Sequence, residues 1–243
     1  MTRVVRAELI KLRTARTYWG LFLTAVALTL LFVILPLALN DSFRTDDDSR
    51  EVLSSAGISG LMVLVLGVVH SAGEYRHGTI GSTLLATPDR LRAMGGQALA
   101  CALVGLAVGL FTALLTAAIA LPWLSARDGA TLPTGELLGL FGGGVLYAGL
   151  ASALGSGLGA TLRNQVLAVV LVLVVLFVVD PTVAALVEDY SAYSLGGLGS
   201  AMSGSSEGIS GDPLPVWEAA LIWAGYTLVL VSAAALLTSR RDI

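Results

Sequence analysis

The sequence predicts an all-α protein that crosses a membrane six times. Of its 243 residues, 56% are hydrophobic and only 13% are charged. Six long apolar runs alternate with short polar connections, and a helix needs about 20 apolar residues to span a hydrocarbon core about 30 Å thick. The lysines and arginines gather on alternate connections, as expected when every other connection stays in the cytoplasm.

The six predicted spans are bounded by charges, prolines or polar clusters. They cover residues 18–39, 53–72, 97–121, 137–160, 166–179 and 216–237, within a single transmembrane domain formed by residues 1–243. The fifth run has only about 14 residues against the usual 20 or so, so a re-entrant segment is an alternative, as are totals of five or seven spans. We favour a span, because Gln165 and Asp180 can then lie in opposite interfaces.

The cations also predict the orientation, because lysine and arginine near span ends are retained in the cytoplasm. With both chain ends inside, eleven of the fourteen cations lie on the inner face and thirteen of the seventeen acids on the outer face. The outer acids include the run Asp46 to Asp48 in the first outer loop. We expect a multi-pass protein of the cell (inner or plasma) membrane. Its basic inner rim favours anionic membrane lipids and gives no reason to expect nucleic acid.

Residues 1–17 predict a helix that lies in the inner membrane interface. Val5, Leu9 and Leu12 recur at helical spacing, and the cations occupy the other faces. A cleaved signal peptide is not favoured, because its apolar stretch would have about 7–15 residues, whereas the run that follows here is of full spanning length. A charge cluster that only fixes the topology is an equally good alternative.

Several kinds of chemical site are disfavoured. The only lysine, Lys11, is not part of a G-x-x-x-x-G-K-S/T phosphate loop, so the chain is not expected to bind ATP in that manner. His70 and His77 lack the H-E-x-x-H pattern of zinc proteases. Cys101 is alone, and no histidine lies in a later span to act as the base for Ser59. We expect no catalytic, cofactor or metal site.

Ionisable residues are nearly absent from the middle of the predicted spans. Asp180, Glu136 and Glu218 fall at predicted outer ends, and His70 with Glu74 at an inner end. A proton-coupled carrier usually keeps a titratable group near its substrate site. The pattern therefore favours a transporter that is driven from outside the membrane.

Small residues spaced four apart predict close packing of helices. Such residues let two backbones approach each other. The glycines expected to pack in this way are Gly105, Gly109, Gly139, Gly143, Gly155 and Gly159.

The connection 74–94, between the second and third spans, carries the strongest local pattern. It reads E-Y-R-H-G-T-I from Glu74 to Ile80 and L-L-A-T-P-D-R from Leu84 to Arg90. Gly78 is expected to end the span, the Thr79 hydroxyl to cap a short helix, and Thr87-Pro88 to end that helix. The connection therefore predicts a short helix along the inner surface, with an ordinary positive-inside connector as the alternative.

The segment 181–215 is predicted to lie outside. It is rich in glycine and serine and contains four acids but no lysine or arginine. Residues 184–193 are expected to form short helices. For residues 196–211 a flexible loop is equally consistent with the composition.

These cytoplasmic stretches resemble the type-2 permease subunits of bacterial ABC exporters. The resemblance also includes the E-L-I-K-L-R-T run from Glu8 to Thr14 and the order of six spans, so it covers essentially the whole chain. The chain departs from the family at Pro88-Asp89-Arg90, where a small or apolar residue often precedes the arginine.

The resemblance implies a permease that binds no cofactor, because ATP and Mg²⁺ are bound by a separate ATPase subunit. It implies that Glu8 and Lys11 belong to a connecting helix and that the loop after the second span is a coupling helix that docks into the ATPase. By resemblance, the coupling region comprises Glu74, Tyr75, Arg76, His77, Gly78, Thr79, Pro88 and Arg90.

The same resemblance implies a second permease copy, identical or similar, and a path for export of hydrophobic or amphipathic cargo such as a drug, lipid or peptide. Two other functions stay open. A non-transporting immunity or structural membrane protein predicts no ATPase partner. An intramembrane enzyme, which is less favoured, predicts paired polar residues at one depth.

Overall fold

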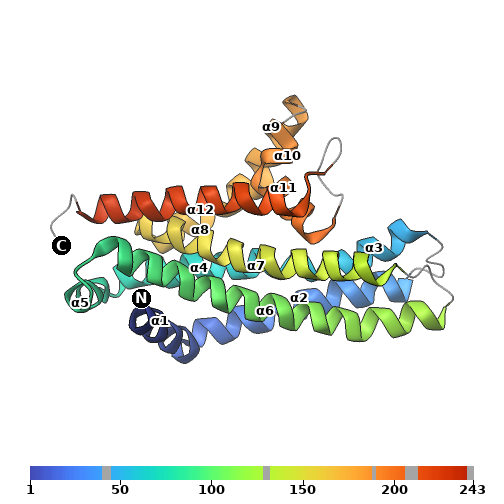
Figure 1. The fold of residues 1–243 in the computed structure, drawn as a ribbon, viewed down its shortest axis with the longest axis horizontal. Helices are drawn as coiled ribbons and strands as arrows, with labels where there is room; N and C mark the ends of the chain where they lie inside the picture. Colours follow the sequence, from blue (N-terminus) through green and yellow to red (C-terminus); the bar gives the residue numbers. More distant parts are fainter. Residues whose placement is uncertain (40–44, 128–131, 188–189, 206–212, 240–243) are drawn as a thin grey trace.

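The computed structural model describes residues 1–39, 45–127, 132–187, 190–205 and 213–239, and over these residues the chain is helical with no strand. Figure 1 shows long helices lying side by side in a bundle. Six of the described helices are long and apolar enough to cross a membrane. The predicted all-helical, six-span architecture is therefore confirmed at the level of helix length and composition.

The helices extend beyond the apolar runs from which they were predicted, because their ends continue into polar residues. The six are α2 (Arg16–Leu39), the continuous α3 (Asp46–Ser54), η1 (Ser55–Gly57) and α4 (Ile58–Arg76), α6 (Arg90–Ala126), α7 (Thr134–Leu162), the continuous α8 (Gln165–Val174), η2 (Val175–Val179) and α9 (Asp180–Leu186), and α12 (Val216–Ser239).

The fifth helix is longer than its predicted bounds of 166–179. It runs from Gln165 to Leu186, which is 22 residues and long enough to span. Pro181 does not end it, because the preceding turn η2 is π-helical and Pro181 lies in the first turn of α9. A proline is tolerated where its missing N–H has no helical partner to lose.

The aspartates Asp46 to Asp48, predicted in a loop, form the first turn of α3. The Thr45 hydroxyl accepts a hydrogen bond from the Asp48 N–H, and the Asp48 carboxylate accepts one from the Thr45 N–H. This reciprocal arrangement is a capping box, and the negative charges also suit the positive end of the helix dipole. The apolar pattern alone could not place this start, because α3 begins with acids.

Helix α7 packs against α4 and α6 through glycines that bring backbones together. The carbonyls of Leu64 and Val68 on α4 occupy the space that a Cβ on Gly155 or Gly159 would fill. On α6, Gly105 lies in the same way against the Ala148 carbonyl of α7, and Gly109 lies against the Ala148 methyl group and the Val145 backbone. Such contacts are typical of helices that pack within membranes.

The two remaining glycines of the predicted packing set differ from each other. Gly143 lies against the Met202 carbonyl of α11 (Leu195–Ser203). Gly139 has no neighbouring atom, within the described part of the chain, less than 4 Å from a Cβ position. The predicted packing role of Gly139 is therefore not seen among the described residues: Gly139 shares the face of Gly143 but lies about 6 Å further along the α7 axis, nearer the start of the helix.

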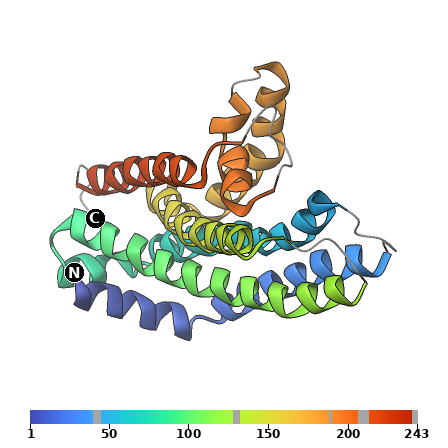
Figure 2. The same cartoon turned by 45° about the vertical axis from the view of Figure 1, so that its right-hand side comes forward.

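The last part of the fifth helix and the two short helices after it project sideways from the bundle (Figures 1 and 2). They are α9, α10 (Tyr190–Tyr193) and α11. The buried Asp180 carboxylate joins them, because it accepts hydrogen bonds from the Tyr190 hydroxyl at 2.8 Å and the Gly196 N–H at 2.9 Å. Residues 195–203 are helical, so the flexible-loop alternative fails there; residues 206–211 lie outside the described residues.

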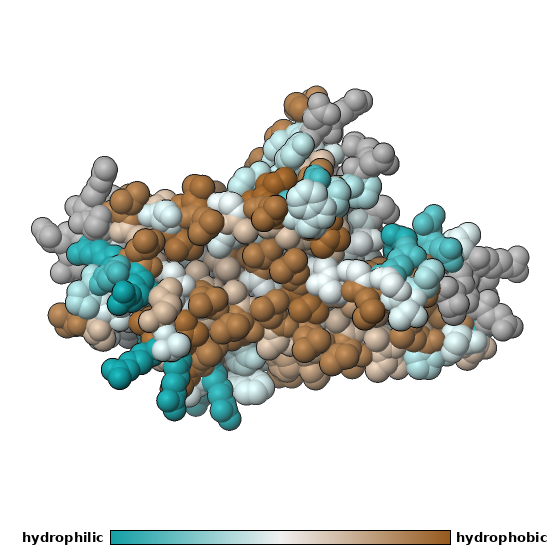
Figure 3. Space-filling view, in the orientation of Figure 1, coloured by the Kyte–Doolittle hydropathy of each residue, from teal (hydrophilic) through white to brown (hydrophobic). Residues whose placement is uncertain are grey.

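The surface separates into an apolar belt and two hydrophilic ends (Figure 3). One end carries α1 (Thr2–Thr14), α5 (Ile80–Ala86) and the last turn of α12, and we call it the basic end. Its described cations are Arg3, Arg6, Lys11, Arg13, Arg16, Arg76, Arg90, Arg92 and Arg163. Whether this end faces the cytoplasm stays a prediction.

Some charges used for the predicted orientation lie outside the described residues. These are Asp41, Arg44, Asp128, Glu188, Asp189, Glu207, Asp212, Arg240, Arg241 and Asp242.

The close approach of α4 and α7 leads to a first prediction. Gly155→Ala is expected to lower the free energy of unfolding by about 1–3 kcal/mol, because the new methyl group would overlap the Leu64 carbonyl. The measurement is denaturant unfolding of the purified protein in micelles. Gly139→Ala is the matched control, with an expected change of less than about 1 kcal/mol in the stabilising direction. Equal effects of the two substitutions would contradict the packing.

Candidate functional site

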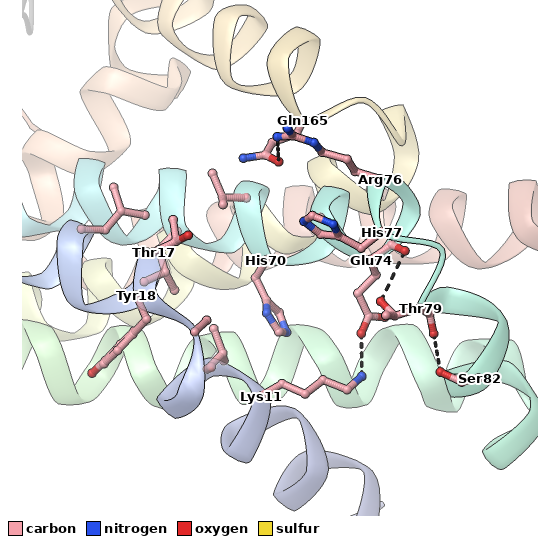
Figure 4. Close-up of a pocket in the computed structure, with 16 residues that line it drawn as sticks. Lys11, Thr17, Tyr18, His70, Glu74, Arg76, His77, Thr79, Ser82 and Gln165 are labelled. Atoms are coloured by element: carbon pink, nitrogen blue, oxygen red, sulfur yellow. Dashed lines mark hydrogen bonds and ion pairs between the residues drawn. The ribbon is translucent and has the colours of Figure 1, made fainter.

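A buried polar cluster joins three helices at the basic end. We call it the Lys11 cluster; it consists of Glu8 and Lys11 from α1, His70 and Glu74 from α4, and Thr83 from α5. Figure 4 shows Glu74 and His70 extending from α4 toward the side on which Lys11 lies. The cluster contains residues predicted for both the connecting helix and the coupling region.

Lys11 lies at the centre of the cluster. Its Nζ donates to Glu8 Oε1 at 2.6 Å, to Glu74 Oε1 at 2.5 Å and to Thr83 Oγ1 at 3.1 Å. His70 donates from Nε2 to the second oxygen of Glu8 at 2.9 Å. One ammonium group therefore bonds to α1, α4 and α5 at the same time.

Residue spacing on two helices explains how these side chains meet. Glu8 and Lys11 are three apart on α1, and His70 and Glu74 are four apart on α4, so each pair shares one helix face. The apolar face of α1 brings the pairs together, because Leu12 is buried against Leu66 of α4 and Cys101 of α6. The amphipathic pattern of residues 1–17 thus corresponds to a helix that packs on the bundle.

Burial makes the pairing energetically important. The side chains of Glu8 and Glu74 are only 2% and 6% exposed, whereas Lys11 is 39% exposed. A carboxylate that is removed from water is costly unless it is paired and hydrogen-bonded. The stability of both buried acids therefore depends on Lys11.

The pKa values of the two α1 groups move in opposite directions. Burial alone would raise the pKa of Glu8, but hydrogen bonds from His70 and Lys11 outweigh it and hold this pKa below its usual value. Burial alone would lower the pKa of Lys11, but its bonds to Glu74 and Glu8 outweigh it and raise this pKa. Both groups are therefore charged at neutral pH.

The turn between α4 and α5 follows the predicted pattern with one exception. Helix α4 ends at Arg76, Gly78 adopts a left-handed φ of 69°, and α5 ends before Thr87 and Pro88. Thr79 is the exception: its hydroxyl donates to the Glu74 carbonyl and does not cap α5. Its backbone is helical, whereas a capping side chain normally requires an extended backbone.

The other residues predicted for the coupling region lie around the cluster. The Tyr75 hydroxyl is 3.3 Å from the Thr238 hydroxyl, and the Arg163 guanidinium lies over the Tyr75 ring at 5.1 Å. Arg76 and His77 are exposed at the end of α4. Pro88 lies in the next connection, and Arg90 is the first residue of α6.

Only Glu74 from the predicted coupling set therefore shares the cluster with Glu8 and Lys11. The roles of His70 and Thr83 were not predicted. The spacing of four between His70 and Glu74 was the available signal for His70. For Thr83 the sequence carries no signal, because its position depends on the turn at Gly78.

A cavity of about 510 Å³ lies beside the Lys11 cluster. Its walls come from α1, α2, α4, α5 and the first residue of α8, and Figure 4 shows the residues that line it. Within the described ranges, no group of three or more histidine, cysteine, aspartate or glutamate side chains is placed to hold a metal ion.

The burial of the cluster predicts the effect of removing its lysine. Lys11→Met is expected to lower the free energy of unfolding by about 1–3 kcal/mol, because two buried carboxylates lose the ammonium group that pairs with them. Adding Glu74→Gln should recover part of this loss, which a double-mutant cycle in micelles would measure. Arg13→Met removes an exposed charge from the same helix and is the control. A loss that is equal for Lys11 and Arg13 would contradict the pairing.

The directions of the two pKa shifts predict how the docking of α1 depends on pH. The depressed pKa of Glu8 stabilises the docked helix above its usual value of 4.5, and this contribution is lost as the pH falls through the lower value. The raised pKa of Lys11 stabilises docking below 10.5, and this contribution is lost as the pH rises through the higher value.

Between these limits the contribution of Glu8 and Lys11 is expected to be constant. Limited proteolysis of α1 across the pH range would test this. A large increase in cleavage at neutral pH, compared with pH values a unit above 4.5, would contradict the assigned shifts.

Comparisons with known proteins assign no family to this arrangement. No protein-family model matches the sequence, and no curated protein is significantly similar to it. A proposal for the function of this protein must therefore be argued from the contacts, burial and charges of the Lys11 cluster.

Proposed function

We propose that this chain is the permease subunit of an ATP-driven exporter in which a separate ABC-type subunit binds ATP and Mg²⁺. The observation that carries the proposal is the bonding of Lys11 to Glu8, Glu74 and Thr83, which ties α1, α4 and α5 together at the basic end. In this proposal α5 is the coupling helix and α1 the connecting helix.

The cluster supports a mechanical role for these helices. A partner that moves α5 would also move Glu74 at the end of the second span, because only residues 77–79 separate α4 from α5. It would move α1 as well, because separating Lys11 from two buried carboxylates is costly. Since α1 is followed directly by α2, the motion reaches the first and second spans together.

An exposed apolar side chain gives the ATPase subunit a surface to bind. Leu85 on α5 is 87% exposed, and it lies at the basic end beyond the apolar belt. A single exposed leucine is common on protein surfaces, so the assignment depends on the place of Leu85 on α5, the helix that is expected to dock. We propose that Leu85 is one centre of the contact with the ATPase subunit.

The spans differ in a way that supports a second permease copy. Helix α4 lies in the interior, whereas α2 and the fifth helix, α8 to α9, expose most of their apolar side chains. We propose that part of this exposed surface faces an identical or similar permease and that hydrophobic or amphipathic cargo passes between the copies. Alternating access would follow when the paired α5 helices move with the ATPase subunits.

The proposal predicts that the protein is isolated with a nucleotide-hydrolysing partner. Tagged protein would be purified from its own cells in mild detergent, and the bound subunit identified by mass spectrometry and ATP hydrolysis. Leu85→Asp is expected to reduce the amount of bound ATPase subunit about tenfold, equivalent to about 1.4 kcal/mol. Leu186→Asp, at an 80% exposed leucine of α9, is the matched control.

Two results would contradict the proposal. One is a chain that is isolated without any ATP-hydrolysing subunit, as a non-transporting membrane protein predicts. The other is equal loss of the partner from Leu85→Asp and Leu186→Asp. Unfolding in micelles would show that both variants are folded.

A further inference from the structure

The cavity of about 510 Å³ beside the Lys11 cluster has two different walls. One wall is apolar and comes from α1, α2 and α4. Its residues are Leu12, Tyr18, Leu21, Leu66 and Val69. The other wall is polar and comes from the end of α4, the following turn and the start of α8.

The polar wall carries a positively charged arginine, Arg76. Arg76 is exposed, and its Nη1 donates to the amide oxygen of Gln165 at 3.3 Å. Among the residues that the structure describes, no acid lies within ion-pair distance of Arg76. Figure 4 shows Arg76 and Gln165 on one side of the cavity and Lys11 on the other.

The remaining titratable groups do not reverse this positive character. Glu74 is the acid in the described cavity lining, and Lys11 already bonds to it at 2.5 Å. Glu8, behind the wall, bonds to Lys11 and His70. His77 and the hydroxyl groups of Thr17 and Ser82 add further hydrogen-bonding groups.

The cavity lies where the apolar belt meets the basic end. Thr17 and Tyr18 are in the first turn of α2, Arg76 is the last residue of α4, and Gln165 is the first residue of α8. In a membrane this level corresponds to the lipid headgroups. Tyr18, Leu21 and Val69 of the apolar wall are partly exposed there. A ligand that fills the cavity therefore needs an anionic head and an apolar tail.

We propose that this cavity binds the phosphate headgroup of an anionic phospholipid. Arg76 and His77 donate to the phosphate oxygens, and the first part of an acyl chain lies against Leu21 and Val69. A free phosphate ion has the same head chemistry, but it would leave the apolar wall uncovered. The site is independent of ATP-driven transport, because it depends only on the walls of the cavity.

The test measures lipid binding to the purified full-length protein in detergent. The probes are a short-chain phosphatidylglycerol, the phosphatidylcholine with the same chains, and inorganic phosphate. Phosphatidylglycerol is expected to bind at least about tenfold more tightly than either of the others. Phosphatidylcholine carries the same phosphate, but its choline cation is repelled by Arg76 and Lys11. Inorganic phosphate has no acyl chain to cover the apolar wall. Equal affinity for phosphatidylcholine overturns the headgroup assignment, and equal affinity for inorganic phosphate overturns the lipid assignment.

Variants locate the binding to this cavity. Arg76→Gln is expected to weaken phosphatidylglycerol binding about tenfold, whereas Arg76→Lys, which keeps the charge, should weaken it less. Arg13→Gln is the matched control, because Arg13 is an exposed arginine of the basic end outside the cavity lining. Equal losses from Arg13→Gln and Arg76→Gln would overturn the site. If Arg76→Gln does not fold, His77→Gln replaces it, and unchanged binding by that variant overturns the proposal.

Discussion

The pairing of Lys11 with two buried carboxylates determines how the basic end is assembled. Glu8 and Glu74 belong to helices that are far apart in the chain, and both buried acids bond to the same ammonium group, whose charge offsets the cost of burying them. Helix α1 must therefore lie across the ends of α4 and α6, with its apolar face inward. The position of α5 follows, because Thr83 bonds to the same lysine.

This polar assembly is built on a bundle whose centre is held by very different contacts. Helix α7 meets α4 and α6 at glycines, and at Gly155, Gly159 and Gly105 the backbone of one helix lies directly against the backbone of the other. Such surfaces tolerate little change in shape. The more exposed α2 and α8 lie at the edges of this centre, and the cavity beside Lys11 lies between them. The side-chain contacts of the Lys11 cluster therefore lie at the basic end, and the backbone contacts at glycines lie within the apolar belt.

The sequence predicts what depends on composition and local spacing. The six apolar runs appear as six long helices, and the spacing of Val5, Leu9 and Leu12 corresponds to the packed face of α1. The fifth helix passes the end of its apolar run because Asp180 is satisfied by partners that come later in the chain. The hydropathy pattern around Asp180 does not show that Tyr190 and Gly196 will bond to it.

The candidate site was predicted less completely for the same reason. Spacing places Glu8 with Lys11, and His70 with Glu74, on common helix faces, but the contact between the two pairs crosses 62 residues of chain. Gly139 and Gly143 likewise share one spacing pattern, yet only Gly143 meets another helix. Whether the two pairs meet, and which glycine packs against another helix, depends on residues that are distant in the sequence.

One consequence follows from the fact that Lys11 is the only lysine in the chain. Its ε-amine is the one side-chain amine that acylating reagents or amine-directed cross-linkers encounter. When α1 is docked, the raised pKa keeps this amine protonated and therefore poorly nucleophilic. When α1 separates from Glu74, the same amine becomes more reactive. The rate at which Lys11 is acylated therefore reports whether α1 is docked on the bundle.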